Sequence, residues 1–166
     1  MGVMADSVSN INWTKYPIRT EWQYNHSLQG GEGMQQVWDI DWNLNDTNTI
    51  YLTTDTTGTW KSTDSGANWN SVRNGVKVYG ATSVASDPKN VNVVLITASK
   101  LTASALASSA EGIYLSVNGG TNWTQVGGNH NFTRAKHGKT ILFDNTTYNG
   151  SQSTTIFVGS AQGLLK

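Results

Sequence analysis

The clearest alternation of apolar and polar positions in this chain runs from Gln35 to Trp42. Its largest apolar side chains, Trp38, Ile40 and Trp42, fall on one face of an extended chain, and a valine and two aspartates fall on the other. A period of two predicts a β-strand. Because aromatic side chains bury large apolar surfaces, the face that carries the tryptophans is expected to be the buried one.

Short runs of β-branched and aromatic residues, separated by turns rich in Asn, Asp and Gly, continue along the chain. They predict further strands at residues 49–54, 58–61, 80–86, 91–98, 112–115, 139–143, 154–158 and 163–166, with two more that begin at Trp69 and Trp123. The Ala- and Ser-rich stretch from Ser99 to Glu111 interrupts this scheme, and its composition fits a surface loop as well as a short helix. The chain is therefore expected to be almost entirely β.

An eight-residue pattern recurs and divides the chain into repeats. STDSGANW at residues 62–69 returns as SVNGGTNW at residues 116–123, so the two tryptophans lie 54 residues apart. The Asp or Asn at the third position can accept hydrogen bonds from backbone N–H groups of its own turn, and the Gly at the fifth supplies the positive φ of a tight hairpin. Both Trp69 and Trp123 are expected to be buried between neighbouring sheets.

Composition narrows the classes of function. Lys and Arg together number 11, as do Asp and Glu, so no net charge favours a nucleic acid or an anionic membrane as partner. The absence of cysteine removes disulfides, thiolate metal ligands and cysteine nucleophiles. The histidines show no metal-ligand spacing, and neither a metal nor a cofactor is expected. No long apolar run predicts a membrane span, and residues 1–10 lack the features of an export signal.

The repeated octet resembles the Asp-box, the hairpin repeat of BNR-type β-propellers. The resemblance implies an all-β fold of four-stranded antiparallel blades, in an incomplete ring of about three blades. Residues 1–166 would form a single partial propeller, with blade 1 at 34–73, blade 2 at 80–126 and the start of blade 3 at 139–166. Residues 11–16 resemble the strand that follows an octet, and are interpreted as the closing strand of a last blade that the sequence lacks.

A second resemblance concerns one end of the predicted blades. At that end, the loops between the second and third strands of each blade lie beside the connections from one blade to the next. Propellers bind ligands where such loops converge. GGEG at residues 30–33 and YLTTDTTG at residues 51–58 resemble the opening of the glycoside hydrolase family 74 xyloglucanases. Asp55 matches one of the two catalytic aspartates of that family, although Thr53 and Thr57 stand where the family motif has Arg and Gly.

The resemblance implies a polysaccharide or oligosaccharide ligand on this face. The side chains expected to bind it are Trp22, Tyr24, Trp60 and His137. Tryptophans in propellers also fill the space between blades, and Asp55 beside Gly58 also fits a residue that caps its own loop. Both interpretations agree with the sequence.

Two hypotheses about function follow. In the first, the chain is the N-terminal part of a secreted enzyme that cleaves xyloglucan or a related β-glucan, with Asp55 as one of two carboxylates. In the second, it belongs to a non-catalytic propeller, such as a cell-surface or phage-tail adhesin, that binds glycan or protein. Both place the protein outside the cell or on a cell or virion surface. Both also require further blades, from another segment or a partner chain, because an open stack exposes an inter-blade face.

Overall fold

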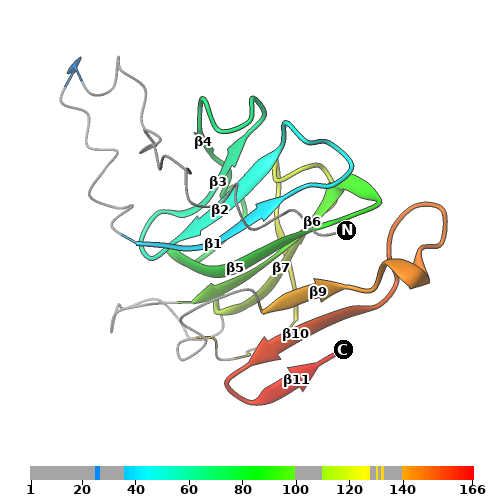
Figure 1. The fold of residues 1–166 in the computed structure, drawn as a ribbon. Helices are drawn as coiled ribbons and strands as arrows, with labels where there is room; N and C mark the ends of the chain where they lie inside the picture. The colour runs from blue at the N-terminus through cyan, green and yellow to red at the C-terminus, as the bar shows by residue number, and fades with distance from the viewer. Residues whose placement is uncertain (1–24, 27–35, 100–109, 128–129, 131, 133–139) are drawn as a thin grey trace, which may run out of the picture.

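The computed structural model describes residues 25–26, 36–99, 110–127, 130, 132 and 140–166, whose strands form three antiparallel sheets (Figure 1). Sheet A contains β1 (Val37–Trp42), β2 (Ile50–Thr54), β3 (Gly58–Ser62) and β4 (Asn70–Ser71). Sheet B contains β5 (Gly80–Asp87), β6 (Asn90–Ser99), β7 (Gly112–Ser116) and β8 (Thr124–Gly127). Sheet C contains β9 (Ile141–Phe143), β10 (Ile156–Ser160) and β11 (Gly163–Leu165), with a 3-10 turn, η4 (Asn145–Thr147), after β9.

Each strand pairs with the next one in sequence, so every sheet is a meander. The prediction of an all-β chain with four-stranded antiparallel sheets is confirmed, and the ring is not closed. The observed strands agree closely with the predicted ones. The strand predicted at residues 49–54 is β2, which starts one residue later, at Ile50, and β7 covers the whole predicted range 112–115. The proposed closing strand at residues 11–16 lies outside the described residues.

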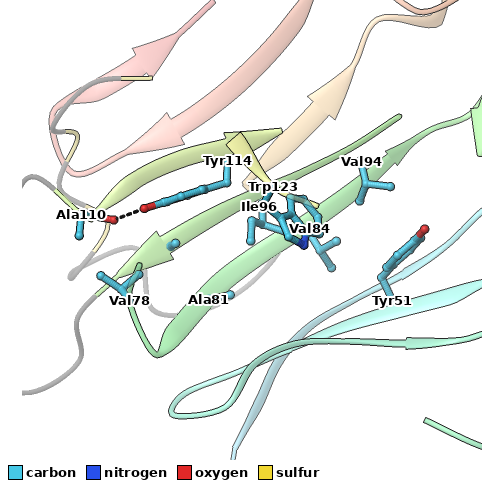
Figure 2. Packing of buried hydrophobic residues seen from close by; sticks show 10 residues of the cluster. Tyr51, Val78, Ala81, Val84, Val94, Ile96, Ala110, Tyr114 and Trp123 are labelled. Atoms are coloured by element: carbon cyan, nitrogen blue, oxygen red, sulfur yellow. Dashed lines mark hydrogen bonds between the residues drawn. The ribbon is translucent and has the colours of Figure 1, made fainter. Parts of the chain in front are cut away.

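Sheet B lies between the other two sheets. Strand β5 packs against β1 and β2 on one side and against β9 on the other. Figure 2 shows the apolar cluster between sheets A and B, in which Tyr51 from β2 joins Val84, Ile96, Tyr114 and Trp123 of sheet B. A second cluster joins sheets B and C through Ala85, Val93, Leu95, Ile113, Phe132, Ile141, Phe143 and Val158. The sheets are therefore held together by apolar side chains on facing surfaces.

The predicted orientation of β1 is wrong. Ile40 and Trp42 are 58% and 59% exposed, whereas Asp39 and Asp41 are buried against sheet B. The aspartates can leave water because sheet B supplies hydrogen-bond donors. Asp39 Oδ2 accepts from Ser83 Oγ (2.6 Å) and Val84 N (3.1 Å). A buried carboxylate is stable only with such partners. Because sheet B provides them, the face of β1 that carries the aspartates is the face that packs against sheet B.

Asp41 makes the second polar link between β1 and β5. Its Oδ2 accepts from the backbone N–H of Ser86 at 2.8 Å and from the hydroxyl of the same serine. One sheet further on, Asp87 accepts from the backbone N–H and the hydroxyl of Ser153. Carboxylates at the inner strands therefore connect sheet A to sheet B and sheet B to sheet C.

The two repeated octets form the same local structure. In the first, Ser62 Oγ donates to Asp64 Oδ1 (2.7 Å) and accepts from Gly66 N (2.8 Å), and Asp64 Oδ1 also accepts from Asn68 N (2.8 Å). The corresponding three distances in residues 116–123 are all 2.9 Å. Asp and Asn are interchangeable here because each bond uses a side-chain oxygen as acceptor.

The two octet tryptophans differ in burial. Trp123 is 4% exposed, so its predicted burial is confirmed. Its Nε1 donates at 2.8 Å to the carbonyl oxygen of Val72, the residue that follows β4 of sheet A. Trp69 is only partly buried, and its Nε1 donates to Gly66 O within its own hairpin. The prediction is wrong for Trp69. Each octet tryptophan would be covered by the preceding sheet: sheet A covers Trp123, but the described residues contain no sheet before sheet A that could cover Trp69.

Candidate functional site

Asp55 lies in the turn between β2 and β3, at the left end of sheet A in Figure 1. The hydroxyl of Thr54 organises this turn: it accepts from Thr57 N at 3.2 Å and lies 2.9 Å from Thr57 Oγ1. Gly58 closes the turn with a φ of +80°, a backbone conformation that residues other than glycine disfavour. A side chain at Gly58 would also begin 3.3 Å from the carbonyl oxygen of Tyr79.

The carboxylate of Asp55 is partly exposed at the end of the sheet. The backbone N–H of Asp55 donates to Gln36 O at 3.3 Å, which ties the turn to the residue before β1. Its Oδ1 accepts one long bond of 3.4 Å from the hydroxyl of the neighbouring Thr56. Thr54 thus organises the turn, and Asp55 is half-buried at the end of the sheet.

Trp60 is the other predicted site residue that the structure describes. It lies on β3, is partly buried, and donates from Nε1 to Thr57 Oγ1 at 3.0 Å. Its cross-strand neighbour is Leu52, so its ring is on the face of sheet A that points away from sheet B. Trp60 is therefore attached to the Asp55 turn through Thr57. The other predicted binding residues, Trp22, Tyr24 and His137, lie outside the described residues.

A cation and an aromatic ring stand beside the Asp55 turn and were not singled out in the sequence. Arg73 Cζ lies 5.1 Å from the ring centroid of Tyr79, and Tyr79 is 56% exposed. Both residues border Gly58, since a Cβ built there would lie 3.9 Å from Arg73 Cβ. They belong to the connection between β4 and β5, which has no periodicity that could have identified them.

Two further contacts occur at the loops predicted to share this face. Glu111, which is 5% exposed, is the last residue of the Ala- and Ser-rich stretch and accepts at 3.3 Å from Oγ of Ser99, the first residue of that stretch. His130 Nδ1 lies 3.2 Å from Gln162 Oε1, so the connection before β9 reaches the β10–β11 turn. In the described part of the chain, no group of three or more His, Asp or Glu side chains is suited to hold a metal ion.

Two ionisable groups with shifted pKa values, Tyr51 and Lys61, lie away from Asp55. Burial raises the pKa of Tyr51, helped by the charges of Asp41 and Asp46, and burial lowers the pKa of Lys61. Lys61 Nζ sits 5.4 Å from the Tyr51 ring centroid and donates to Gly119 O at 2.9 Å. This arrangement joins sheet A to the second octet hairpin and is structural.

A pocket at the ends of β1, β5 and β9, the first strands of the three sheets, is also distant from Asp55. This pocket of about 310 Å³ lies at the turns that follow β1, β5 and β9, which are at the opposite end of the strands from the β2–β3 turn (Figure 1). Its lining is mostly apolar and includes Trp42, Leu44, Pro88 and Leu142.

Comparison with solved structures relates these sheets to one group of enzymes. A GH74 enzyme from Niastella koreensis matches 77% of this chain with 22% identity and a TM-score of 0.57. An ancestral GH74 enzyme matches 81% with 18% identity and a TM-score of 0.58, and the GH74 xyloglucanase from Xanthomonas campestris matches 80% with 15% identity and a TM-score of 0.51. This chain has the fold of GH74 propeller enzymes.

The likeness has a clear extent. The matched region is 20%, 17% and 22% of the three GH74 chains, so this chain spans about a fifth of their length. At such sequence identities, the likeness establishes the fold. Searches with protein-family models and against curated proteins find no match.

Proposed function

We propose that this chain is the N-terminal part of a secreted, glycoside hydrolase-like propeller that acts on xyloglucan or a related β-glucan. The observation that carries the proposal is Asp55, which lies half-buried in the β2–β3 turn of sheets that share the GH74 fold. The sequence of that turn resembles the catalytic turn of the family. The Xanthomonas campestris neighbour is a xyloglucanase, which suggests the class of substrate.

Cleavage of a glycosidic bond needs a carboxylic acid and a second carboxylate on either side of that bond. Asp55 is proposed as one member of this pair. Its partner would belong to the blades that complete the ring. Trp22, Tyr24, Trp60 and His137 are proposed to contact sugar rings beside it, because aromatic faces stack on the apolar faces of sugars. A polysaccharide substrate implies an extracellular or surface location, and no helix of bilayer-spanning length and hydropathy occurs among the described residues.

The proposal includes the division of the chain. Residues 1–166 are a single partial propeller, with blade 1 at 34–73, blade 2 at 80–126 and blade 3 beginning at 139. The strands of sheets A and C fall inside these ranges, and sheet B extends one residue beyond its range, to Gly127. The remaining blades would be supplied by a further segment or by a partner chain.

Replacement of Asp55 by Asn tests the catalytic assignment in the longest natural form of the protein. Asp55→Asn keeps the size of the side chain but removes the acid or base, so release of reducing sugar from xyloglucan should fall by roughly 10²–10⁴-fold. Binding of xyloglucan, measured by affinity electrophoresis, should be retained.

The matched control is Asp144→Asn, the same change in the turn after β9, at the other end of the sheets. It should leave turnover unchanged, because an Asn there can still accept from Thr146 N. Full activity of Asp55→Asn would reject the catalytic role of Asp55.

A non-catalytic propeller that binds glycan or protein is the second candidate, and the Arg73–Tyr79 pair favours it. An exposed ring braced by a guanidinium is a binding surface that needs no second carboxylate. Under this alternative, Tyr79→Ala should weaken binding to xyloglucan, and the unaltered protein should release no reducing sugar. Turnover that is lost in Asp55→Asn would exclude it.

A further inference from the structure

The chain contains three Asn–Gly pairs, at residues 74–75, 118–119 and 149–150. An asparagine before a glycine can lose its side-chain amide, because the backbone nitrogen of the glycine can attack the side-chain carbonyl carbon without hindrance from a Cβ atom. The attack needs an accessible side chain and a backbone that is free to move. The three pairs share the same two residue types but differ in their surroundings, so the fold decides which of them can react.

The pair at residues 74–75 is packed against the second octet. The carbonyl oxygen of Asn74 accepts from the backbone N–H of Trp123 at 2.9 Å, and Asn74 Nδ2 donates to Asn122 Oδ1 at 2.6 Å. A Cβ atom built on Gly75 would lie 2.2 Å from the carbonyl oxygen of Trp123, so backbone fills the space beside this glycine. Movement of the Gly75 nitrogen toward the Asn74 side chain would break these contacts.

The pair at residues 118–119 is held by residues of sheets A and B. Asn118 Oδ1 accepts from Ser116 Oγ at 2.9 Å. Gly119 is buried, and its N–H donates to Asn92 O at 2.9 Å. Its carbonyl oxygen accepts from Lys61 Nζ at 2.9 Å. Attack by the Gly119 nitrogen would require loss of its bond to Asn92, so the folded chain protects this pair as well.

The pair at residues 149–150 lies exposed in the turn between η4 and β10 (Figure 1). Apart from its own chain neighbours, no heavy atom lies within 4 Å of a Cβ atom built on Gly150, and among the described residues its N–H has no acceptor. Asn149 Oδ1 accepts from the backbone N–H groups of Ser151 at 2.9 Å and Gln152 at 3.0 Å. These bonds fold the Asn149 side chain over the backbone that follows it, where the nitrogen of Gly150 lies.

The same two donors assist the reaction itself. When the Gly150 nitrogen attacks Cγ of Asn149, the electron pair of the carbonyl moves to Oδ1, and backbone N–H groups directed at such an oxyanion stabilise it. The proton of the Gly150 N–H passes through water to Nδ2, which leaves as ammonia, and a succinimide ring remains. Water then opens the ring at either of its carbonyls and gives aspartate or isoaspartate. The balance is one water consumed and one ammonia released, with no change of oxidation state.

We propose that Asn149 is the site at which the folded chain deamidates, and that the fold protects Asn74 and Asn118. The inference goes beyond the proposed function and is independent of catalysis by Asp55.

The modified turn connects sheets B and C. The carbonyl oxygen of Ser151 accepts from Asn90 Nδ2 at 2.7 Å, and Ser153 donates to Asp87 from its backbone N–H and its hydroxyl. Aspartate at position 149 keeps the acceptor oxygen of the turn. Isoaspartate brings its β carbon into the main chain and so displaces the residues that make these bonds. Formation of isoaspartate should therefore loosen the contact between the two sheets.

Peptide mapping by mass spectrometry tests the proposal on the folded chain. The protein is kept at mildly alkaline pH in water enriched in heavy oxygen, which labels each asparagine that is converted during the incubation. A parallel sample is unfolded in guanidinium chloride. In the folded sample, Asn149 should convert at least about tenfold faster than Asn74 and Asn118, because those two react only after local opening. Unfolding should accelerate Asn74 and Asn118 and should leave Asn149 no faster.

Asn149→Gln is the matched variant, because attack on the longer side chain would have to form a larger ring. It should remove the label at position 149 and leave the slow conversion of Asn74 and Asn118 unchanged, while a circular-dichroism spectrum like that of the parent checks the fold. Conversion of Asn74 or Asn118 as fast as that of Asn149 in the folded chain would overturn the proposal. So would conversion of Asn149 that is slower in the folded chain than in the unfolded one.

Discussion

At the scale of single residues, the aspartates of this chain differ because their surroundings differ. Asp39 and Asp41 are buried and accept from serines and backbone N–H groups of the next sheet. Asp64 is exposed and accepts within its own hairpin, chiefly from Asn68 and Ser62. Asp55 accepts one long bond from its neighbour. The same side chain thus serves packing, local structure and, in our proposal, chemistry.

Asp64 provides a prediction about pH. Hydrogen bonds from the side chain and backbone of Asn68, and then from Ser62, hold the pKa of Asp64 below its usual value. A carboxylate whose pKa is lower in the folded state stabilises the fold above the unfolded pKa, about 3.9, and loses that contribution as the pH falls through the folded pKa. The parent should therefore melt above Asp64→Asn near neutral pH, and the difference should shrink in acid.

The second octet supplies the control for this prediction. Asn118→Asp introduces a carboxylate with the same partners, so this variant should gain the acid dependence that Asp64→Asn loses. Thermal melts followed by circular dichroism from neutral to acidic pH measure both variants. A difference between parent and Asp64→Asn that does not change with pH would contradict the assignment.

At the scale of elements, each octet hairpin is determined by its own residues, but the contribution of its tryptophan depends on the neighbouring sheet. Both hairpins make the same serine and carboxylate or amide bonds. Trp123 packs against sheet A and bonds to Val72, whereas Trp69 bonds only within its own hairpin among the described residues. Equivalent positions in the repeat are therefore not equivalent in energy.

This difference predicts unequal costs for two matched substitutions. Trp123→Ala should lower the free energy of unfolding by about 3–5 kcal/mol, as expected for a fully buried aromatic side chain. Trp69→Ala should cost clearly less, because its side chain already meets water. Urea unfolding followed by tryptophan fluorescence and circular dichroism measures both. Equal costs would show that Trp69 is covered in solution, for example by a further sheet.

At the scale of the whole molecule, sheet B is the only described sheet with a described sheet packed on both of its faces. Sheet B has apolar clusters on both faces, whereas sheets A and C each have one. Backbone amides exchange with solvent through local opening, and opening costs more where both faces are packed. The stability of this chain should therefore be greatest in the middle of the stack.

Hydrogen exchange followed by mass spectrometry checks this expectation. In dilute solution, peptides from β5 and β6 should exchange more slowly than those from β1 or β11. Equal exchange in all three sheets would contradict this expectation.

The sequence by itself determined the strand positions, the hairpin repeat and the placement of Asp55 in a turn at the end of a sheet. These features depend on neighbours within a few residues: alternation defines a strand, and Ser, Asp and Gly at fixed offsets close a hairpin. The resemblance around residues 51–58 is also local, so Asp55 can be proposed as a carboxylate of the site from the sequence alone. The Arg73–Tyr79 pair could not, because folding of an irregular connection brings it to that turn.

Only the tertiary structure decided which face of β1 is buried and which octet tryptophan is covered. Alternation shows that Asp39 and Asp41 share a face, but burial of that face depends on donors from residues 83–86, about 44 positions away. A pattern read along one strand carries no information about such donors, and hydrophobicity alone favoured the opposite face. Burial of a tryptophan likewise needs a sheet on the correct side. Contacts between distant segments supply the free energy that makes these choices, and only the fold brings those segments together.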